Sequence, residues 1–407
     1  MAASRAELLV RKPGQPPVVS YLELFFDLVF VFALTQLSRW GLDQLASQHQ
    51  VAVAGQAVLL LLALMMVWLL TAWITNVYDP QRPEIQLVVA TAMFGALVMA
   101  VALPEAFGPK ALEFAGAYVT IHIGRGLVLV PLLRGQGEAQ RRAAGTLLWF
   151  AVSAVWWIVG ATADENSTRV ALWALALAIE YTGAMLFFPA PWVRHRRWPV
   201  VAKHIAERYL QFFIITLGEL IAVTGATNGA NYLESGGSVA AFFISFVTTL
   251  LLWRTYLYRA GALLPAAIAA APAPARLTRE ALLAHLIMVA GIVAADAGFE
   301  LVIAQPMGHT SVTWIGLIVG GPAVFLAGRV LFGHAIFARV SESRVIGALL
   351  LALTAPAMIF LPPLAVAIMV TLVLVGIVVS DVILARGRPP KPPSPPDGRP
   401  TTGRGRT

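Results

Sequence analysis

The sequence lacks cysteine and is poor in charge. None of its 407 residues is cysteine, which excludes a disulfide framework, a thiolate metal site and a thiol nucleophile. Only 12% of the residues are charged and 58% are hydrophobic, whereas about a quarter of a soluble domain is charged. Together with a mean hydropathy of +0.77, this composition indicates an integral membrane protein.

Motifs of nucleotide, metal and acyl chemistry are also missing. The sequence has no P-loop, no HExxH, no GxSxG and no dinucleotide-binding fingerprint followed by an acid. We therefore predict that the chain is not an enzyme, that it binds no cofactor and no metal, and that it is not a self-contained ATP-driven pump. Any transport is expected to be passive or coupled to an ion gradient.

Long apolar stretches recur along the chain. Each has about 17–25 residues, the length of helix that crosses a ~30 Å hydrocarbon layer. An Ala/Pro-rich connector is expected at 262–275, and only Pro362 and Pro363 separate the last two stretches. The predicted fold is an all-α integral membrane protein with about twelve transmembrane helices, at residues 22–42, 52–76, 85–103, 112–133, 144–162, 169–188, 206–225, 238–258, 281–304, 312–333, 345–361 and 364–385.

Basic residues mark every second loop. Lys and Arg accumulate on the cytoplasmic side of a membrane, and the opposite loops hold little beyond Lys110 and Arg169. Both termini are then predicted to be cytoplasmic, in a multi-pass protein of the inner or plasma membrane whose partner is the lipid bilayer. The net charge of +8 follows from this topology and from attraction to anionic head groups, so we predict no nucleic-acid partner.

The pattern divides the chain into five segments. We predict a cytoplasmic N-terminal segment at 1–19, a first six-helix half at 20–188, a basic cytoplasmic linker at 189–204, a second six-helix half at 205–385 and a disordered, proline-rich basic tail at 386–407.

The second half weakly repeats the first. The run ELFFDLVFVFALTQL from Glu23 aligns with ERYLQFFIITLGELI from Glu207. Further matches follow in the same order and in helices of equal rank, which predicts two six-helix repeats in parallel orientation, with sites between the halves. These matches are Trp73, Thr75 and Tyr78 with Trp253, Thr255 and Tyr258, and Gly124-Arg125 with Gly328-Arg329.

Two of these runs resemble a known family. The opening ELFFDLVFVFALTQLS and the block HIAERYLQFFIITLGELIAVTG are similar to the bacterial low-temperature-requirement protein A (LtrA) family, over essentially the whole chain up to the tail. The resemblance implies a polytopic inner-membrane protein linked by name to growth in the cold. It implies no reaction, substrate or catalytic residue, because the family brings no established set of these.

A shorter stretch around Asp27, FFDLVFVFALT, is similar to the first-helix F-S-D motif of potassium channels built from six-helix repeats. The sequence departs from that pattern in two places. No serine precedes Asp27, and the seventh helix has Gln211 where the repeat would have an acid. The resemblance implies a cation channel as an alternative function.

Acids within apolar helices form the candidate site. A carboxylate at the bilayer centre costs about 2.5–3.5 kcal/mol on insertion scales, so it usually faces a partner or water. At about 100° per residue, Glu23 and Asp27 share one stripe of the first helix. We predict an ion or proton path along Glu23, Asp27, Glu180, Glu207, Glu219, Asp296 and Glu300, with charge partners His122, Arg125, Arg254, His285 and Arg329.

Structural alternatives stand beside this interpretation. Glu23 and Glu207 lie near helix starts, where an acid also caps a helix. Asp27 and Glu207 are also candidates for interhelical ion pairs with Arg125 or Arg329 that play no part in transport. His285 is expected to be a hydrogen-bonded bundle histidine, and an interfacial aromatic belt is favoured over a substrate pocket for Trp73, Tyr78, Trp253 and Tyr258.

Three functions remain open. The favoured hypothesis is a carrier of a small solute or ion, coupled to a proton or monovalent cation gradient, because Glu219 lies in a glycine-interrupted LGE segment at mid-membrane. The alternatives are a cation channel and a structural or lipid-related stress factor. Gly316 and Gly320 form a small-xxx-small pair that suits packing within one chain or in a homo-oligomer.

Overall fold

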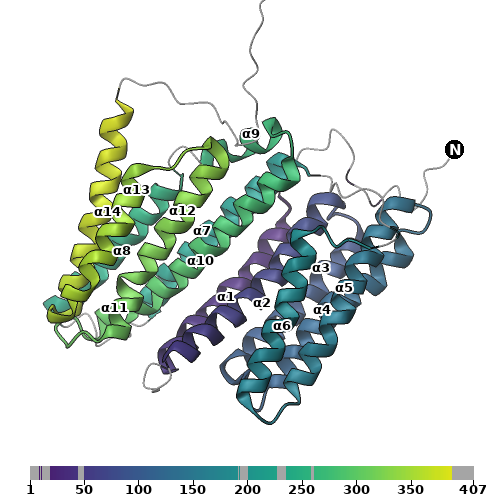
Figure 1. The fold of residues 1–407 in the computed structure, drawn as a ribbon, viewed down its shortest axis with the longest axis horizontal. Coiled ribbons are helices and arrows are strands. Elements are labelled where there is room, and N and C mark those ends of the chain that lie inside the picture. Colours follow the sequence, from purple (N-terminus) through teal and green to yellow (C-terminus); the bar gives the residue numbers. More distant parts are fainter. Residues whose placement is uncertain are drawn as a thin grey trace, which may run out of the picture.

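The computed structural model describes residues 9, 11, 19–44, 50–190, 192, 200–226, 235–257 and 261–386, and these contain helices but no β-strand. Short 3-10 helices extend α3 and α13, at η2 (Leu103–Glu105) and η5 (Ala355–Phe360). The α-helices, shown in Figure 1, are α1 (Tyr21–Asp43), α2 (Gln50–Val77), α3 (Pro83–Ala102), α4 (Ala111–Leu132), α5 (Gly137–Ala161), α6 (Asn166–Met185), α7 (Ala202–Ala226), α8 (Gly236–Tyr256), α9 (Ala262–Ala270), α10 (Pro274–Ala304), α11 (Val312–Ile318), α12 (Gly320–Phe337), α13 (Glu342–Thr354) and α14 (Pro363–Ala385).

The helices are those of a multi-pass membrane protein. Within the described ranges, 10 helical segments are long and apolar enough to cross a membrane, and α6 and α7 are 20 and 25 residues long. The predicted connector at 262–275 is partly wrong, since α9 occupies much of it and α10 begins at Pro274. Proline is well suited to a first helical turn, where its missing N–H is not needed.

The helices pack into two groups, which lie side by side in Figure 1. In the first group α1 packs against α2 and α3, and the contacts continue from α3 to α4, α5 and α6, which returns to α2. In the second group α7 packs against α8 and α10, and the contacts continue from α10 to α12, α13 and α14, which returns to α8. Each group is therefore a closed ring of helices.

Glycines bring α10 and α12 into close contact. A Cβ on Gly291 would lie 2.4 Å from the backbone nitrogen of Phe325, and one on Gly321 would lie 2.5 Å from that of Ala295. Such distances leave no room for a side chain, so the two backbones approach as they do in other small-residue membrane interfaces.

The predicted pair Gly316 and Gly320 does not seat helices within the chain. An added Cβ on either would meet no atom within 4 Å among the described residues. The small residues that let α10 and α12 approach are instead Gly291, Gly321 and Gly328. Periodicity alone does not separate these glycines, because both sets have helical spacing.

The two groups meet along α1 and α2 of the first and α7 and α10 of the second. Aromatic rings fill this contact: the ring centres of Trp68 and Phe212 are 4.4 Å apart, and those of Phe30 and Phe212 are 6.1 Å apart. The contact holds most of the acids that the sequence analysis selected, so it is where the candidate site lies.

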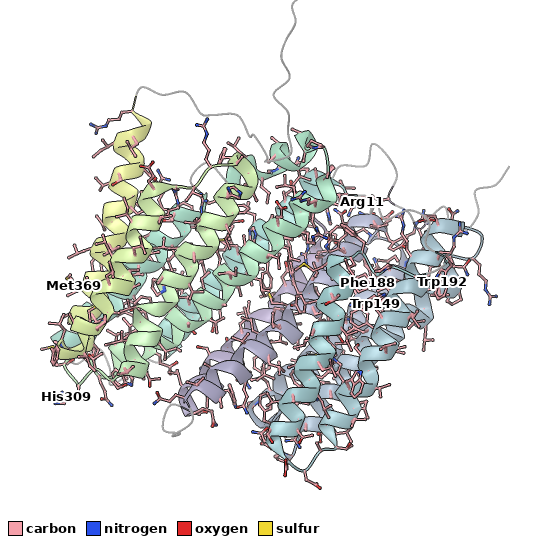
Figure 2. All side chains as sticks on the ribbon, viewed as in Figure 1. Arg11, Trp149, Phe188, Trp192, His309 and Met369 are labelled. Atoms are coloured by element: carbon pink, nitrogen blue, oxygen red, sulfur yellow. The ribbon has the colours of Figure 1, made fainter. Side chains whose placement is uncertain are left out.

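The predicted segments 1–19, 189–204 and 386–407, and the side chain of Tyr258, fall largely outside the described residues. Arg11 is an exception, and it is labelled in Figure 2. Its Nη2 donates to the carbonyl of Thr75 at 2.9 Å, and its backbone N–H donates to Val77. Partial burial lowers the pKa of Arg11, against the opposing effect of nearby acids. The N-terminal segment is thus attached to the end of α2 at this residue.

Candidate functional site

Asp27 forms a buried ion pair with Arg208 across the two groups. Arg208 Nη1 donates to Asp27 Oδ2 and Nη2 donates to Oδ1, both at 2.7 Å. The indole nitrogen of Trp68 donates to Oδ1 at 2.9 Å, and both charged side chains are fully buried. The guanidinium fork matches a carboxylate in this two-point arrangement. Both oxygens of Asp27 are therefore engaged.

Glu23 extends this network at the start of α1. The backbone N–H and the hydroxyl of Ser20 donate to Glu23 Oε2 at 2.8 and 2.9 Å, completing a capping box. Glu23 Oε1 lies 3.0 Å from His204 Nε2 and 3.7 Å from Arg208 Nε. Glu23 thus caps its helix, as the structural alternative predicted, and also contacts the second group.

Two sequence predictions about these acids are wrong. The partner of Asp27 is Arg208, not Arg125 or Arg329. Glu207 turns away from the network toward Lys203, 3.8 Å from its Nζ, with 29% of the Glu207 side chain exposed. One residue of helix turns a side chain by about 100°, so Glu207 points in a different direction from its fully buried neighbour Arg208.

Glu219 and Asp296 form a second buried cluster, which is acidic. Their carboxyls face each other between α7 and α10, and Ser38 Oγ of α1 donates to Asp296 Oδ2 at 2.8 Å. Glu219 is fully buried and Asp296 nearly so. Within the described part of the chain, both oxygens of Glu219 and Oδ1 of Asp296 have no hydrogen-bond partner.

Three further polar groups surround this acid pair. Thr35 and Arg39 of α1 face Glu219, and Glu300 lies one turn beyond Asp296 on α10. Glu219, Asp296 and Glu300 of the predicted path therefore lie together. Among the described residues, no arginine is bonded to the pair as Arg208 is to Asp27.

A cavity of about 240 Å³ approaches the acid pair between α1, α2 and α10. Ser38, whose hydroxyl binds Asp296, is one of its lining residues. Its other polar lining residues are Gln44, Gln50 and Thr313. Ser38 therefore connects the lining of this cavity to Asp296.

Glu180 belongs to the first group alone. Its Oε1 accepts from Ser153 Oγ at 2.6 Å and from Trp157 Nε1 at 2.9 Å, and its Oε2 accepts from the Tyr118 hydroxyl. A buried carboxyl with donors on both oxygens is a structural element of the helix packing. Glu180 does not join the acid pair, contrary to the predicted continuous path.

The predicted charge partners also lie apart from the acids. His285 Nδ1 bonds to the carbonyl of Ala281 at 2.6 Å, so this nitrogen carries the proton, and its Nε2 accepts from the Tyr256 hydroxyl at 2.7 Å. This agrees with the expected bundle histidine. Arg329 Nε donates to the carbonyl of Thr255 at 2.9 Å, and Arg254 lies in the last turn of α8.

His122 and Arg125 lie together on α4, at a different cavity of about 430 Å³. Arg125 Nη2 donates to Thr71 Oγ1 at 2.9 Å, and the His122 ring stacks on Phe150 at 4.1 Å. Neither contacts Asp27 or the acid pair in the described chain, so the prediction that they are partners of these acids is wrong.

Comparison with known proteins shows the family to which the chain belongs. A sequence model described as bacterial low temperature requirement A protein (LtrA) matches residues 18–379. The chain belongs to the LtrA family. An uncharacterized protein, RA0937 of Rhizobium meliloti (strain 1021), is 34% identical over 334 residues, which are 81% of this chain and 80% of that protein. No solved structure matches the chain.

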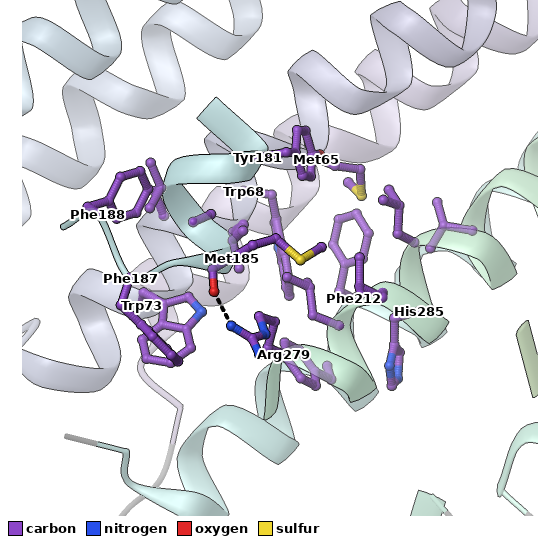
Figure 3. A pocket seen from close by; sticks show the side chains of 18 residues that line it. Met65, Trp68, Trp73, Tyr181, Met185, Phe187, Phe188, Phe212, Arg279 and His285 are labelled. Carbon is purple, nitrogen blue, oxygen red and sulfur yellow. Dashed lines mark hydrogen bonds between the residues drawn. The ribbon is translucent and has the colours of Figure 1, made fainter. Parts of the chain in front are cut away.

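The LtrA chain also has a small, mainly apolar hollow where its two groups meet, of about 60 Å³ (Figure 3). Arg279 of α10 reaches the end of α6 there, where it donates to the carbonyl of Met185 and lies 5.1 Å from the ring centre of Phe187. Phe187 and Phe188 both have positive φ, at 60° and 47°, an uncommon conformation for bulky residues. Phe188 and Trp149, both labelled in Figure 2, lie beside Gly183.

The exposure that an aromatic belt requires is present at one residue of the LtrA chain and absent at two, for which the belt prediction is wrong. Trp253 is 42% exposed, as a belt requires. Trp73 is buried and lines the hollow of Figure 3. Tyr78 lines the cavity that holds Arg125. Sequence reasoning placed these aromatics by their nearness to helix ends, which does not say whether a neighbouring helix covers them.

Sequence reasoning also missed His204 and Arg208 as functional candidates of the LtrA chain. The available signal was helical spacing: taking His204 as 0°, Arg208 lies at about 40° and Glu219 at about 60°, whereas Glu207 lies at about 300°. A stripe chosen to include the basic residues would have found both clusters.

Proposed function

We propose that this LtrA-family protein is a carrier of a small solute or ion coupled to a proton or a monovalent cation, with Glu219 and Asp296 as the coupling-ion site. The observation that supports this most is the three carboxylate oxygens of the pair that lack hydrogen-bond partners in the described chain. Two facing carboxylates in a low-dielectric interior cannot both remain ionised without a compensating charge. A proton or a dehydrated monovalent cation supplies that charge.

The position of the pair suits a carrier. Asp296 and Glu219 belong to the second group, whereas Ser38, which holds Asp296, belongs to the first. A relative movement of the two groups therefore changes the surroundings of both carboxyls. Carrier sites commonly lie between two such halves for this reason.

Access to the pair differs between the two ends of the bundle. The cavity of about 240 Å³ approaches through Ser38 from the end where α1 stops and α2 begins. Toward the other end, the network of Glu23, Asp27 and Arg208 fills the contact between α1 and α7. We infer a state open on one side and closed on the other, in which this network is the closed gate.

We also infer that the chain has twelve spans arranged as two parallel six-helix repeats. The identical order of helix packing in the two rings supports the repeat. So does the contact of each ring's buried arginine with the second helix of that ring: Arg125 donates to the hydroxyl of Thr71 on α2, and Arg329 donates to the carbonyl of Thr255 on α8. Arg82, Arg134 and other basic residues lie in loops at one end, which supports a cytoplasmic location for that end and for both termini in the cell membrane.

Carbodiimide labelling tests the coupling-ion site. Dicyclohexylcarbodiimide reacts with protonated carboxyls in apolar surroundings, so we expect it to modify Glu219 or Asp296 in the purified protein. Labelling should fall as pH rises and should be blocked by the coupling cation, offered as Na⁺, K⁺ or Li⁺. Arg39 and Glu300 face the pair and contribute to its pH response. Mass spectrometry of peptides locates the label.

Glu207→Gln is the matched control, because this acid lies on the same helix as Glu219 but pairs with Lys203 at the surface. Labelling should persist in this variant and disappear in Glu219→Gln combined with Asp296→Asn. Equal labelling in the double variant would remove the proposed site.

Flux in liposomes separates the carrier from the channel. Under an imposed potential, a carrier should show ion movement that depends on the proton or cation gradient and is lost in Glu219→Gln. A channel would conduct K⁺ without a counter-ion and would lose that current in Asp27→Asn. The neutralisation of Asp27 by Arg208 supports the carrier, because a paired carboxylate offers no free oxygens to a passing cation. No flux with any ion would argue for a structural role.

A further inference from the structure

The cavity beside Arg125 lies inside the first ring, away from the proposed coupling-ion site. It is enclosed by α2, α4 and α5 and has a volume of about 430 Å³, within the range of small-molecule pockets. It extends from the turn between α4 and α5, at Gly135 and Gln136, inward to His122 and Phe150. Arg125 is seven residues before Leu132, where α4 ends, which places it about 10 Å inside the helix end.

Arg125 lines this cavity with an unneutralised charge. The residue is 7% exposed, and its Nη2 donates to the hydroxyl of Thr71, which carries no charge. Its Nε and Nη1 have no hydrogen-bond partner in the described chain. A buried guanidinium is costly unless it is paired, so the arrangement is incomplete without an acceptor.

His122 presents a second unused polar group to the same cavity. It lies one turn before Arg125, on the same side of α4, and is 3% exposed. Its ring stacks on Phe150 with an angle of 4° between the planes. Neither ring nitrogen has a hydrogen-bond partner among the described residues. The stacking fixes the ring while leaving an N–H available to a ligand.

Two acids near the cavity are engaged with other groups. Glu180 accepts from Ser153 and Trp157 on one oxygen and from Tyr118 on the other. Glu138, at the mouth, is 3.2 Å from Arg142 Nε.

Tyr78 also lines the cavity, and burial raises its pKa to about 12. This phenol therefore stays neutral at ordinary pH and does not supply the missing negative charge.

We propose that this cavity binds an amphipathic monoanion, whose carboxylate or phosphate head contacts Arg125 and His122. The walls support an apolar body rather than a fully polar anion, because most of the lining is aliphatic or aromatic. Its apolar residues include Leu70, Ile74, Leu129, Leu147 and Phe150. The free guanidinium nitrogens form charge-assisted hydrogen bonds with such a head group, which are stronger than neutral ones.

Binding of decanoate tests this assignment. The full-length protein is placed in nanodiscs of neutral phosphatidylcholine, and tritiated decanoate is titrated, with empty nanodiscs as background. We expect saturable binding that decyl phosphate displaces, whereas decanol and decyltrimethylammonium, which share the tail but lack the negative charge, do not. Arg125→Met should weaken binding by at least about tenfold, the loss expected for a hydrogen bond to a charged group.

Arg329→Met is the matched control, since it removes a buried arginine from the corresponding position of the second ring. It should leave decanoate affinity unchanged. Thr146→Phe fills the cavity without removing the charge and should also weaken binding, so a misfolded Arg125→Met does not end the test. Unchanged affinity in Thr146→Phe or in folded Arg125→Met, or equal displacement by decanol, overturns the proposal.

Nanodiscs of phosphatidylglycerol distinguish the source of the anion. If a lipid head group is the natural occupant, decanoate binding should be suppressed there and restored in phosphatidylcholine. If a free carboxylate is the occupant, binding should persist in both.

Discussion

Breaking the pair between Asp27 and Arg208 should be among the most damaging single changes to stability. Both side chains are fully buried, and removing one partner of such a pair leaves an uncompensated charge at a cost of about 3–5 kcal/mol. In Asp27→Asn, Arg208 keeps two contacts with Glu23, to its backbone carbonyl at 3.1 Å and to its side-chain carboxylate at 3.7 Å. We therefore expect a loss at the lower end of this range. Arg208→Gln leaves two carboxylates facing each other, so we expect the upper value.

The measurement is the free energy of unfolding from SDS titration in mixed micelles, followed by circular dichroism. In the double variant the losses should not add, because neither charge is then left unpaired. We expect its cost to fall below the sum of the single costs by up to about 3 kcal/mol. Additive losses would show that the two residues are not coupled as the 2.7 Å contacts imply.

Lys203→Met provides the control on the same helix. Its ion pair with Glu207 is long, at 3.8 Å, and 58% of the lysine side chain is exposed. Such surface pairs contribute under about 1 kcal/mol. A control loss as large as that of Arg208→Gln would mean that any charge change on α7 destabilises the protein, and the reasoning would fail.

Three other changes can be followed by the same titration. Gly291→Ala should cost about 1–3 kcal/mol, because its Cβ would lie 2.4 Å from a backbone nitrogen of α12, whereas Gly316→Ala should be neutral. Glu180→Gln should cost roughly 1–3 kcal/mol, because the amide nitrogen cannot accept the hydrogen bonds that a carboxyl oxygen accepts, without altering ion flux, and an effect on flux alone would contradict its structural role. Arg344→Met should cost about 3 kcal/mol, because it removes the arginine whose Nη2 lies 2.7 Å from the buried carboxylate of Asp381; a neutral result would mean that water screens this pair.

Much of the fold followed from composition and apolar length. Long apolar stretches predict transmembrane helices reliably, because a chain in lipid must form its backbone hydrogen bonds within each spanning segment. The exception was the connector at 262–275, where the prolines suggested an irregular chain but α9 includes Pro265. Pro265 is the fourth residue of α9, where its missing N–H affects only the first hydrogen bond of the helix. The number of prolines, taken without their positions, misled the prediction.

The candidate site was predicted in part. Asp296 and Glu219 were found because no helix end lies near them. A carboxylate so deep in the bilayer is costly to insert, so its position in the sequence already suggests a function. The partners His204 and Arg208 were not found, because the buried face of a helix depends on which helices pack against it. Glu207 was selected and its neighbour Arg208 was not, because only the packing of α7 against α1 shows which of the two is buried.

Arg125 is the opposite case, because the acids predicted to be its partners lie elsewhere in the structure. From the sequence, Arg125 was expected to be a cation available to the acids, since an intramembrane arginine usually has a partner. The ring of helices separates it from them, and its neighbours in space are Thr71 and an apolar cavity. The sequence shows that Arg125 is charged, but it does not show which groups surround the guanidinium.

The contact between Asp27 and Arg208 has a consequence for how the protein is made. The two residues are 181 positions apart, so at about 5–20 residues per second the ribosome takes roughly 10–35 s to deliver the arginine after the aspartate. Trp68 follows Asp27 by only 41 positions and offers an early hydrogen bond, but no positive charge. During that interval the first helix must reside at the insertion machinery, or hold its carboxyl in the neutral form, until the seventh helix arrives.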